Sequence, residues 1–137
     1  MVEKMSALEN RLVDYALELS YEELPAETIR QAKRRIGDTI GGAIGAYGAL
    51  PSRIARQMAQ PVAAGPSARV WGSLVETTPE MAAFANGTML RYLDINDTYR
   101  TTDGSHPSDN LGGILAVTEM LGGSGKDDLE GRPLPLA

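Results

Sequence analysis

The 137-residue chain contains no cysteine and only one histidine, one tryptophan and one phenylalanine. Without cysteine it has neither a disulfide framework nor a thiolate nucleophile, which is compatible with a reducing compartment. One histidine among loop carboxylates lacks the ligand pattern of a zinc site, and the stretch DINDTYRTTDGS lacks the glutamate that closes a calcium loop. The composition therefore predicts no metal site, and we expect a cytoplasmic protein.

Positive charge and long apolar runs are also scarce. Thirteen Lys and Arg stand against 18 Asp and Glu, giving a formal charge of -5 and a pI near 4.8. Nucleic-acid phosphates need a basic face, so a nucleic-acid partner is not expected. No apolar run approaches the roughly 20 residues that cross a bilayer, and the charged start MVEKMSALENRLVDYALELS lacks the apolar core of a signal peptide. A membrane is not expected as a partner either.

Helical periodicity covers most of the chain and predicts an all-α helical bundle. The first helix is expected over about residues 6–19, and a second from near Pro25, after a Ser20-Tyr21-Glu22-Glu23 stretch with capping-box spacing. A short third helix is expected to be capped by Ser52 and to end before Pro61. The loop that follows it has a brief extended piece at residues 68–71.

The fourth and fifth helices are expected to flank a polar loop. Thr78-Pro79-Glu80 is a strong helix-start signal, and the helix that follows delivers Asp94 at or near its C-terminal end. Ser108 or Asp109 is expected to cap the fifth helix, which Gly122-Gly123 stops. The predicted apolar stripes include Leu8, Leu12, Tyr15, Leu19, Ile29, Ala32, Ile36, Ile40, Ile44, Met81, Phe84, Ala85, Met89, Leu93, Leu111, Ile114, Leu115 and Leu121, and we expect Trp71, Met81 and Met89 to lie in the core.

The second helix is unusually rich in glycine. Each glycine in a helix interior costs up to about 1 kcal/mol relative to alanine, so the run IGDTIGGAIGAYG predicts close backbone packing against a neighbour. A phosphate-binding loop is excluded, because no Gly-Lys-Ser/Thr follows and the segment has the pattern of a helix rather than of a strand and turn.

The stretch RYLDINDTYRTTDGSHPSDNLGG, residues 91–113, contains the only histidine, His106. If the flanking helices pack side by side, the loop brings His106 toward Asp94 and Thr98. An aspartate near a histidine is suited to general acid-base catalysis, because histidine titrates near neutral pH. The residues alone leave an alternative open, in which Asp94 and Asp97 are helix-end or turn residues and His106 is an exposed loop histidine.

Three segments together resemble the N-terminal part of the MmgE/PrpD family, and especially its 2-methylcitrate dehydratases. They are LSYEELPAETIRQAKRRIGDTIGGAIGAYG, AAFANGTMLRYLDINDTY and GSHPSDNLGGILAVTEMLGGSGKDDL, which fall in order within residues 18–129. The longer pattern LDINDT...HPSDNLGGILA is closer to the 2-methylcitrate dehydratase branch than to the cis-aconitate decarboxylase branch.

The resemblance implies a cofactor-independent, metal-free carbon-oxygen lyase, a hydro-lyase that converts 2-methylcitrate to 2-methyl-cis-aconitate and water in the methylcitrate cycle of propionate catabolism. It implies a large helical domain and a smaller α+β lid with the tricarboxylate between them. By match to the family motifs, Asp94 and His106 are expected to transfer protons, and Thr98 and Ser108 to bind the substrate. A cis-aconitate decarboxylase-like or other MmgE/PrpD activity is the alternative.

Family members are several times longer than this chain, which ends EGRPLPLA. We expect residues 1–129 to be part of the helical domain and residues 130–137 to be an irregular tail, with the lid absent. A truncated, inactive piece is then expected, because the missing part would supply the remaining pocket residues. We also expect a homo-oligomer, since the second and fifth helices leave apolar surface exposed. A non-catalytic helical fragment that acts only by association is the second alternative.

Overall fold

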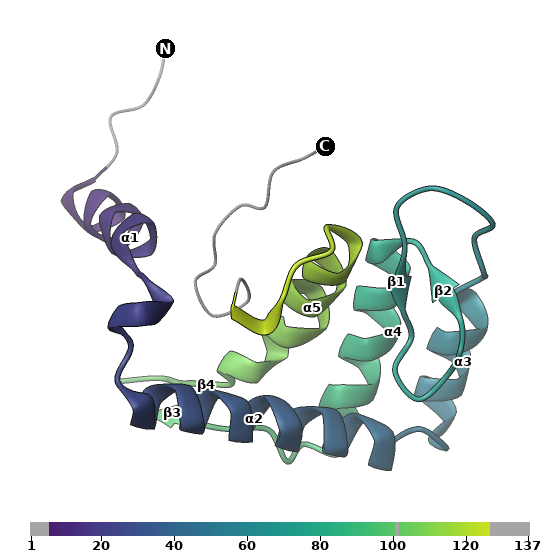
Figure 1. Cartoon of the computed structure of the whole chain (residues 1–137). Helices are drawn as coiled ribbons and strands as arrows, with labels where there is room; N and C mark the ends of the chain where they lie inside the picture. The colour runs from purple at the N-terminus through teal and green to yellow at the C-terminus, as the bar shows by residue number, and fades with distance from the viewer. Residues whose placement is uncertain (1–5, 101, 127–137) are drawn as a thin grey trace.

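Five α-helices dominate the structure, a computed structural model that describes residues 6–100 and 102–126 (Figure 1). They are α1 (Ala7–Glu18), α2 (Ala26–Gly45), α3 (Leu50–Met58), α4 (Pro79–Tyr92) and α5 (Leu111–Met120). Two 3-10 turns, η1 (Tyr21–Glu23) and η2 (Pro107–Asn110), precede α2 and α5. Within these described ranges no helix is both long and apolar enough to cross a membrane. The prediction of an all-α fold is confirmed.

The β-structure in the described residues consists of two small antiparallel hairpins. Strand β1 (Ala68–Arg69) pairs with β2 (Glu76–Thr77), and β3 (Tyr99–Arg100) pairs with β4 (Gly104–Ser105). The extended piece predicted at residues 68–71 therefore contributes a strand of only two residues. The predicted irregular tail, residues 130–137, lies outside the described part of the chain.

Helix α4 is the central element, because α5, α3 and α2 all pack against it (Figure 1). Its start has the predicted cap: the Thr78 hydroxyl accepts a hydrogen bond from the Met81 N–H at 3.4 Å, with Pro79 in the first turn. The helix ends at Tyr92, so Asp94 follows its C-terminal end directly, as predicted.

Small residues form most of the core around α4. Alanine side chains let helices approach closely, and the prediction that Met89 is buried is confirmed, whereas Trp71 and Met81 are only partly buried and pack against the core. The buried apolar residues are Ala43, Ala46, Ala55, Ala59, Ala68, Val70, Ala82, Ala85, Met89, Leu90 and Ala116. Most of the larger apolar side chains of these helices therefore lie outside this core.

Many of the large apolar residues in the predicted stripes are exposed. Helix α1 has no buried residue, and the exposed fractions of Leu8, Leu12 and Tyr15 are 62%, 61% and 66%. On α2 and α5, Ile44 and Ile114 are also exposed, at 44% and 41%. The amphipathic patterns therefore mark faces that the described residues do not cover.

The predicted start of the second helix near Pro25 is confirmed, but the expected side-chain caps at Ser20 and Ser52 are wrong. The Ser20 hydroxyl donates to the Glu22 carboxylate instead of capping a helix, and α2 begins after Pro25. Ser52 lies inside α3 and is fully buried, while Ala49 occupies the N-cap. Both helices have a proline at their start, and its fixed φ suits the start of a helix without a side-chain cap.

The predicted cap of the fifth helix is also wrong. Ser108 and Asp109 belong to η2, and Asn110 precedes α5 without a side-chain cap. Asn110 itself has right-handed helical dihedrals, φ -76° and ψ -18°. The 3-10 turn that Pro107 opens runs straight into the α-helix, so no extended capping residue is present.

Close glycine packing occurs, but mainly at a different helix from the one predicted. On α2, Gly42 and Gly45 approach Ile95 and Leu93 to about ordinary contact distance, 3.4 Å for an added Cβ, whereas Gly37 and Gly41 have no such neighbour among the described residues. The tightest backbone approach is at Gly112 of α5, where an added Cβ would lie 3.0 Å from the Gly87 nitrogen and 3.2 Å from the Ala83 carbonyl oxygen of α4.

We predict that Gly112→Ala lowers the free energy of unfolding by about 1 to 3 kcal/mol, because the new methyl group meets α4 backbone that cannot turn aside. Urea denaturation followed by circular dichroism measures the change. Gly113→Ala is the matched control: it lies in the same helix, with no described atom within 4 Å of the added Cβ, and should leave stability unchanged or raise it by up to about 1 kcal/mol. Equal effects of the two substitutions would contradict the close crossing.

Candidate functional site

The candidate site lies where the chain leaves α4 and where it enters η2. Asp94 follows the end of α4, and its φ of 53° is the only positive φ among the described non-glycine residues. Its N–H donates to the Arg91 carbonyl oxygen at 3.2 Å. A left-handed residue commonly ends a helix, but glycine usually occupies this position. An aspartate here therefore places a carboxylate at a point where the chain turns sharply away from the helix.

The Asp94 carboxylate is ionised near neutral pH. It forms an ion pair with Arg91, and 73% of its side chain is exposed. The hydrogen bond from Arg91 and the charge of that guanidinium hold the pKa of the Asp94 carboxyl below its usual range, and His106 adds a smaller lowering. The joint role of Asp94 and His106 in proton transfer stays a prediction.

His106 is half-buried just before η2, and its imidazole is held by the loop. Its Nδ1 lies 2.7 Å from the backbone carbonyl oxygen of Asp97. That contact joins the two ends of the loop, because Asp97 follows α4 and His106 precedes α5. His106 is therefore held against the segment that follows α4, at Asp97, and its expected role in proton transfer beside Asp94 and Thr98 stays a prediction.

Asp97 contacts the segment before α5 and also α2. One carboxylate oxygen accepts a hydrogen bond from the Ser108 N–H at 3.0 Å, and the other lies 3.4 Å from Nη1 of Arg35 on α2. Its side chain is only 13% exposed. The open alternative, a solvated turn aspartate, does not describe this residue.

Ser108 is buried, with 3% of its surface exposed. Its hydroxyl accepts a hydrogen bond from the Asn96 side-chain amide at 3.2 Å, while its N–H donates to Asp97. These contacts give Ser108 a structural role in joining the two segments, and its expected role in substrate binding stays a prediction. Thr98 is exposed immediately before β3, and its substrate-binding role also stays a prediction.

A polar cavity of about 300 Å³ lies beside this loop, against α2. Asp97 and Ile95 from the loop line it, together with Gln31, Arg34, Arg35 and Asp38 from α2. Asp94, Thr98 and His106, which are expected to act on one substrate, do not line the α2 cavity. Within the described residues, α2 thus adds the cationic side chains of this hollow.

Sequence reasoning missed the contributions of Arg35 and Arg91. The position of Arg91, three residues before Asp94 on a predicted helix, is a signal for an ion pair that could have been used. No such local signal exists for Arg35, which lies 62 residues before Asp97 in the chain. Only the packing of α2 against α4 brings it to the loop.

The donor set of the described residues does not suggest a metal centre. No group of three or more His, Asp or Glu side chains in residues 6–100 and 102–126 is arranged to hold a metal ion. The carboxylates of Asp94 and Asp97 are instead paired with Arg91 and Arg35. Metal-free chemistry stays a prediction from the family resemblance.

A family profile described as the MmgE/PrpD N-terminal domain matches residues 10–132, which include the whole candidate site. The chain belongs to the MmgE/PrpD family. Its helical architecture agrees with that domain, and the resemblance deduced from the sequence motifs is confirmed.

Several relatives of this MmgE/PrpD chain are named 2-methylcitrate dehydratase. That of Salmonella typhimurium is 36% identical over 114 residues, covering 80% of this chain and 23% of the relative. That of Escherichia coli K12 is 51% identical over 53 residues, or 39% of this chain and 11% of the relative. A mitochondrial 2-methylcitrate dehydratase of Yarrowia lipolytica is 45% identical over 64 residues, covering 47% and 12%. The chain therefore spans less than a quarter of the length of these relatives, and its family resemblance is to lyase-type enzymes.

The left-handed backbone at Asp94 gives a stability prediction. Asp94→Gly and Asp94→Ala both remove the carboxylate, but only glycine adopts φ near 53° without a steric cost. We expect the thermal midpoint of the alanine variant to lie about 4 °C or more below that of the glycine variant, measured by circular dichroism.

The neighbouring Leu93 provides the control, because its φ of -81° is right-handed. There, Leu93→Ala should be more stable than Leu93→Gly, the opposite order. An alanine variant as stable as the glycine variant at position 94 would show that the left-handed conformation is absent in solution.

Proposed function

We propose that this chain is the N-terminal portion of a dehydratase that removes water from 2-methylcitrate to give 2-methyl-cis-aconitate. The observation that carries the proposal is its match over residues 10–132 to a family whose relatives bear that name. The proposed setting is the methylcitrate cycle of propionate catabolism in the cytoplasm. A decarboxylase acting on cis-aconitate is the nearest alternative within the family.

The proposed chemistry needs two proton-transferring groups. Elimination of water removes a proton from carbon and protonates the departing hydroxyl, and we assign these transfers to Asp94 and His106. We assign Asp94 as the group that accepts a proton, because its carboxyl, whose pKa Arg91 lowers, is ionised at neutral pH. Thr98 and Ser108 are proposed to bind substrate oxygens.

A tricarboxylate substrate also needs cationic partners. The described residues supply Arg91 beside Asp94, and Arg34 and Arg35 in the α2 cavity, but the whole chain carries a net charge of -5. The Salmonella relative is more than four times as long as the segment that it shares with this chain. We therefore propose that turnover requires residues corresponding to the remainder of that relative.

The activity is tested by joining this chain to the part of the Salmonella relative that follows its matched segment. We expect the fusion to convert 2-methylcitrate to an unsaturated product, detected by absorbance and mass spectrometry, and the isolated chain to show no turnover. His106→Ala and Asp94→Ala in the fusion should each lower kcat/KM by about 100-fold or more, the usual scale for a general acid or base.

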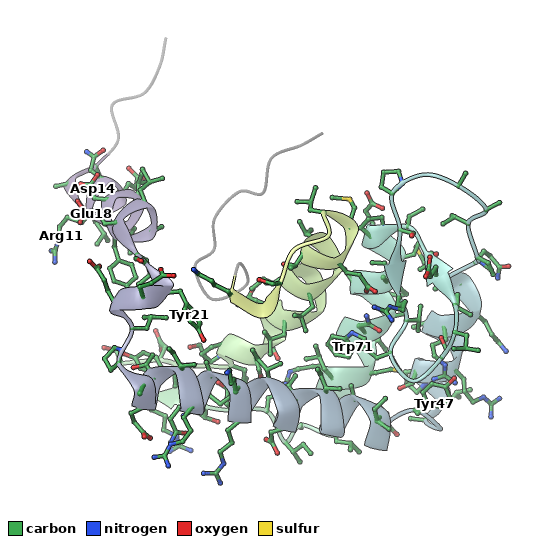
Figure 2. All side chains as sticks on the ribbon, in the orientation of Figure 1. Arg11, Asp14, Glu18, Tyr21, Tyr47 and Trp71 are labelled. Atoms are coloured by element: carbon green, nitrogen blue, oxygen red, sulfur yellow. The ribbon has the colours of Figure 1, made fainter. Side chains whose placement is uncertain are left out.

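Asp14→Asn is the matched control, because it removes an exposed carboxylate on α1 (Figure 2). It should leave turnover within about twofold. Near-normal turnover by both site variants would refute the assignment of Asp94 and His106. A fusion that decarboxylates cis-aconitate but leaves 2-methylcitrate unchanged would favour the alternative activity.

A second candidate function, association without catalysis, is favoured by the exposed apolar surface. Two adjoining hollows of about 640 and 630 Å³ share Leu115, Ser124 and Gly125 and form a continuous trough between α2 and α5. Its apolar lining includes Ile36, Ile40 and Ile44, which are spaced four residues apart along α2.

We propose that α1 of a second copy occupies this trough. Helix α1 is about 18 Å long at 1.5 Å per residue, and its apolar residues have no cover in the described structure. Its polar positions include Glu9, Asp14 and Glu18, whereas Lys33 lines one end of the trough. The apolar surfaces and these charges are complementary.

The association is tested by sedimentation velocity over a range of protein concentrations, where we expect a dimer. Leu12→Glu should shift the protein to monomer, because it places a charge on the apolar face of α1. The matched control is Asn10→Glu, which adds the same charge at an exposed position on another side of the helix. A wild-type monomer at all concentrations, or equal effects of both substitutions, would refute this interface.

A further inference from the structure

The contact between His106 and Asp97 determines which imidazole nitrogen carries the proton in neutral His106. The atom 2.7 Å from Nδ1 is a backbone carbonyl oxygen, which can accept a hydrogen bond but cannot donate one. Nδ1 must therefore be the donor. In the neutral ring Nε2 is then left without a proton, and this is the nitrogen that can accept one.

The same residue also holds the backbone beyond the ring. The carboxylate of Asp97 accepts a hydrogen bond from the Ser108 N–H at 3.0 Å. Asp97 therefore contacts His106 through its backbone carbonyl and Ser108 through its side chain. Arg35 of α2 lies 3.4 Å from the second carboxylate oxygen. Asp97 thus connects the segment after α4 to the segment before α5 and anchors both to α2.

The burial of the Asp97 side chain strengthens these contacts. The Asp97 side chain is 13% exposed, in contrast to the 73% of Asp94, although the two aspartates are only three residues apart. Water competes less for a buried carboxylate that accepts a backbone N–H than for an exposed ion pair. Asp94 remains accessible for chemistry, whereas Asp97 is committed to holding the loop.

We infer that Asp97 is a positioning residue that fixes His106 as the Nδ1–H tautomer and presents Nε2 as the proton-exchanging atom. The claim about the tautomer stands on the geometry alone, and its catalytic consequence rests on the proposed function. An aspartate carboxylate commonly orients a histidine directly. Here the backbone carbonyl contacts the ring, and the carboxylate keeps that carbonyl in place.

Nitrogen NMR of the isolated chain, labelled with ¹⁵N-histidine, tests the inference without any assay of activity. His106 is the only histidine, so the spectrum contains one imidazole. At a pH where the ring is neutral, we expect a protonated Nδ1 and an unprotonated Nε2, the reverse of the preference of free histidine. An Nε2–H tautomer in the wild-type chain would overturn the inference, whatever the substituted chains do.

Two substitutions at position 97 distinguish the side-chain contacts. Asp97→Ala removes the acceptor for the Ser108 N–H, so the tautomer should shift toward that of free histidine. Asp97→Asn retains an oxygen that can accept that N–H, and it should keep the Nδ1–H form. Arg35→Gln is the matched control, because it removes only the ion pair and should also keep Nδ1–H.

If Asp97→Ala leaves a folded chain with the wild-type tautomer, the positioning role is refuted. If that variant does not fold, the wild-type tautomer and the Asp97→Asn spectrum still decide the matter, since loss of Nδ1–H in a folded Asn variant would also contradict the assignment of the Ser108 contact.

Kinetics separate this inference from the proposed function. In the fusion protein described above, Asp97→Ala should lower kcat by about 10-fold or more with KM within about twofold, because a misoriented imidazole impairs proton transfer more than binding. An Nδ1–H tautomer in a fusion that does not act on 2-methylcitrate would refute the function and leave the positioning role intact. A normal kcat together with an altered tautomer would refute the catalytic consequence.

Discussion

The close crossing of α4 and α5 is the constraint on which the candidate site depends. At Gly112 the two helices approach so closely that even a methyl group would meet the backbone at Gly87 and Ala83. This crossing fixes the distance between the end of α4, which leads to Asp94, and the turn η2, which follows His106. A wider separation would require longer side chains at the crossing and would move Asp97 away from Ser108. The loop chemistry is thus set by a packing contact that contains no functional group.

Polar contacts then hold the loop between α4 and η2 in place. The Asp97 carboxylate holds the Ser108 N–H, its carbonyl holds the His106 ring, and Arg35 ties this arrangement to α2. The network is asymmetric in its exposure: Asp97 is largely buried, while Asp94 stands at the surface on a left-handed residue, paired with Arg91. Two aspartates of one motif therefore have different physical roles, one in holding the loop and one in presenting a charge.

The distribution of apolar residues leaves several helix faces uncovered by the described residues. Alanines fill the core around α4, while Leu8 and Leu12 on α1 and Ile44 on α2 remain exposed. The chain matches 23% of the length of the Salmonella relative. Its exposed apolar faces are surfaces on which other helices or a second copy can pack. The trough between α2 and α5 is the surface that the proposed association uses.

The sequence by itself determined the helices, the cap of α4 and the family, because these depend on local periodicity, on Thr78-Pro79 and on motifs read in order along the chain. It also predicted that the loop before the fifth helix would bring His106 back toward the end of α4, and the structure holds His106 against Asp97 of that segment. It did not identify Ser52 as buried, nor did it separate Asp97 from the solvated turn aspartates, because burial depends on which elements cover a residue.

The ion pair of Arg35 with Asp97, the approach at Gly112 and the proton position on His106 were decided only by the tertiary structure. Each depends on residues distant in the chain or on the direction of a single carbonyl group. Helical periodicity is a property of neighbouring residues and can be read from their order, whereas these contacts exist only after the helices have packed.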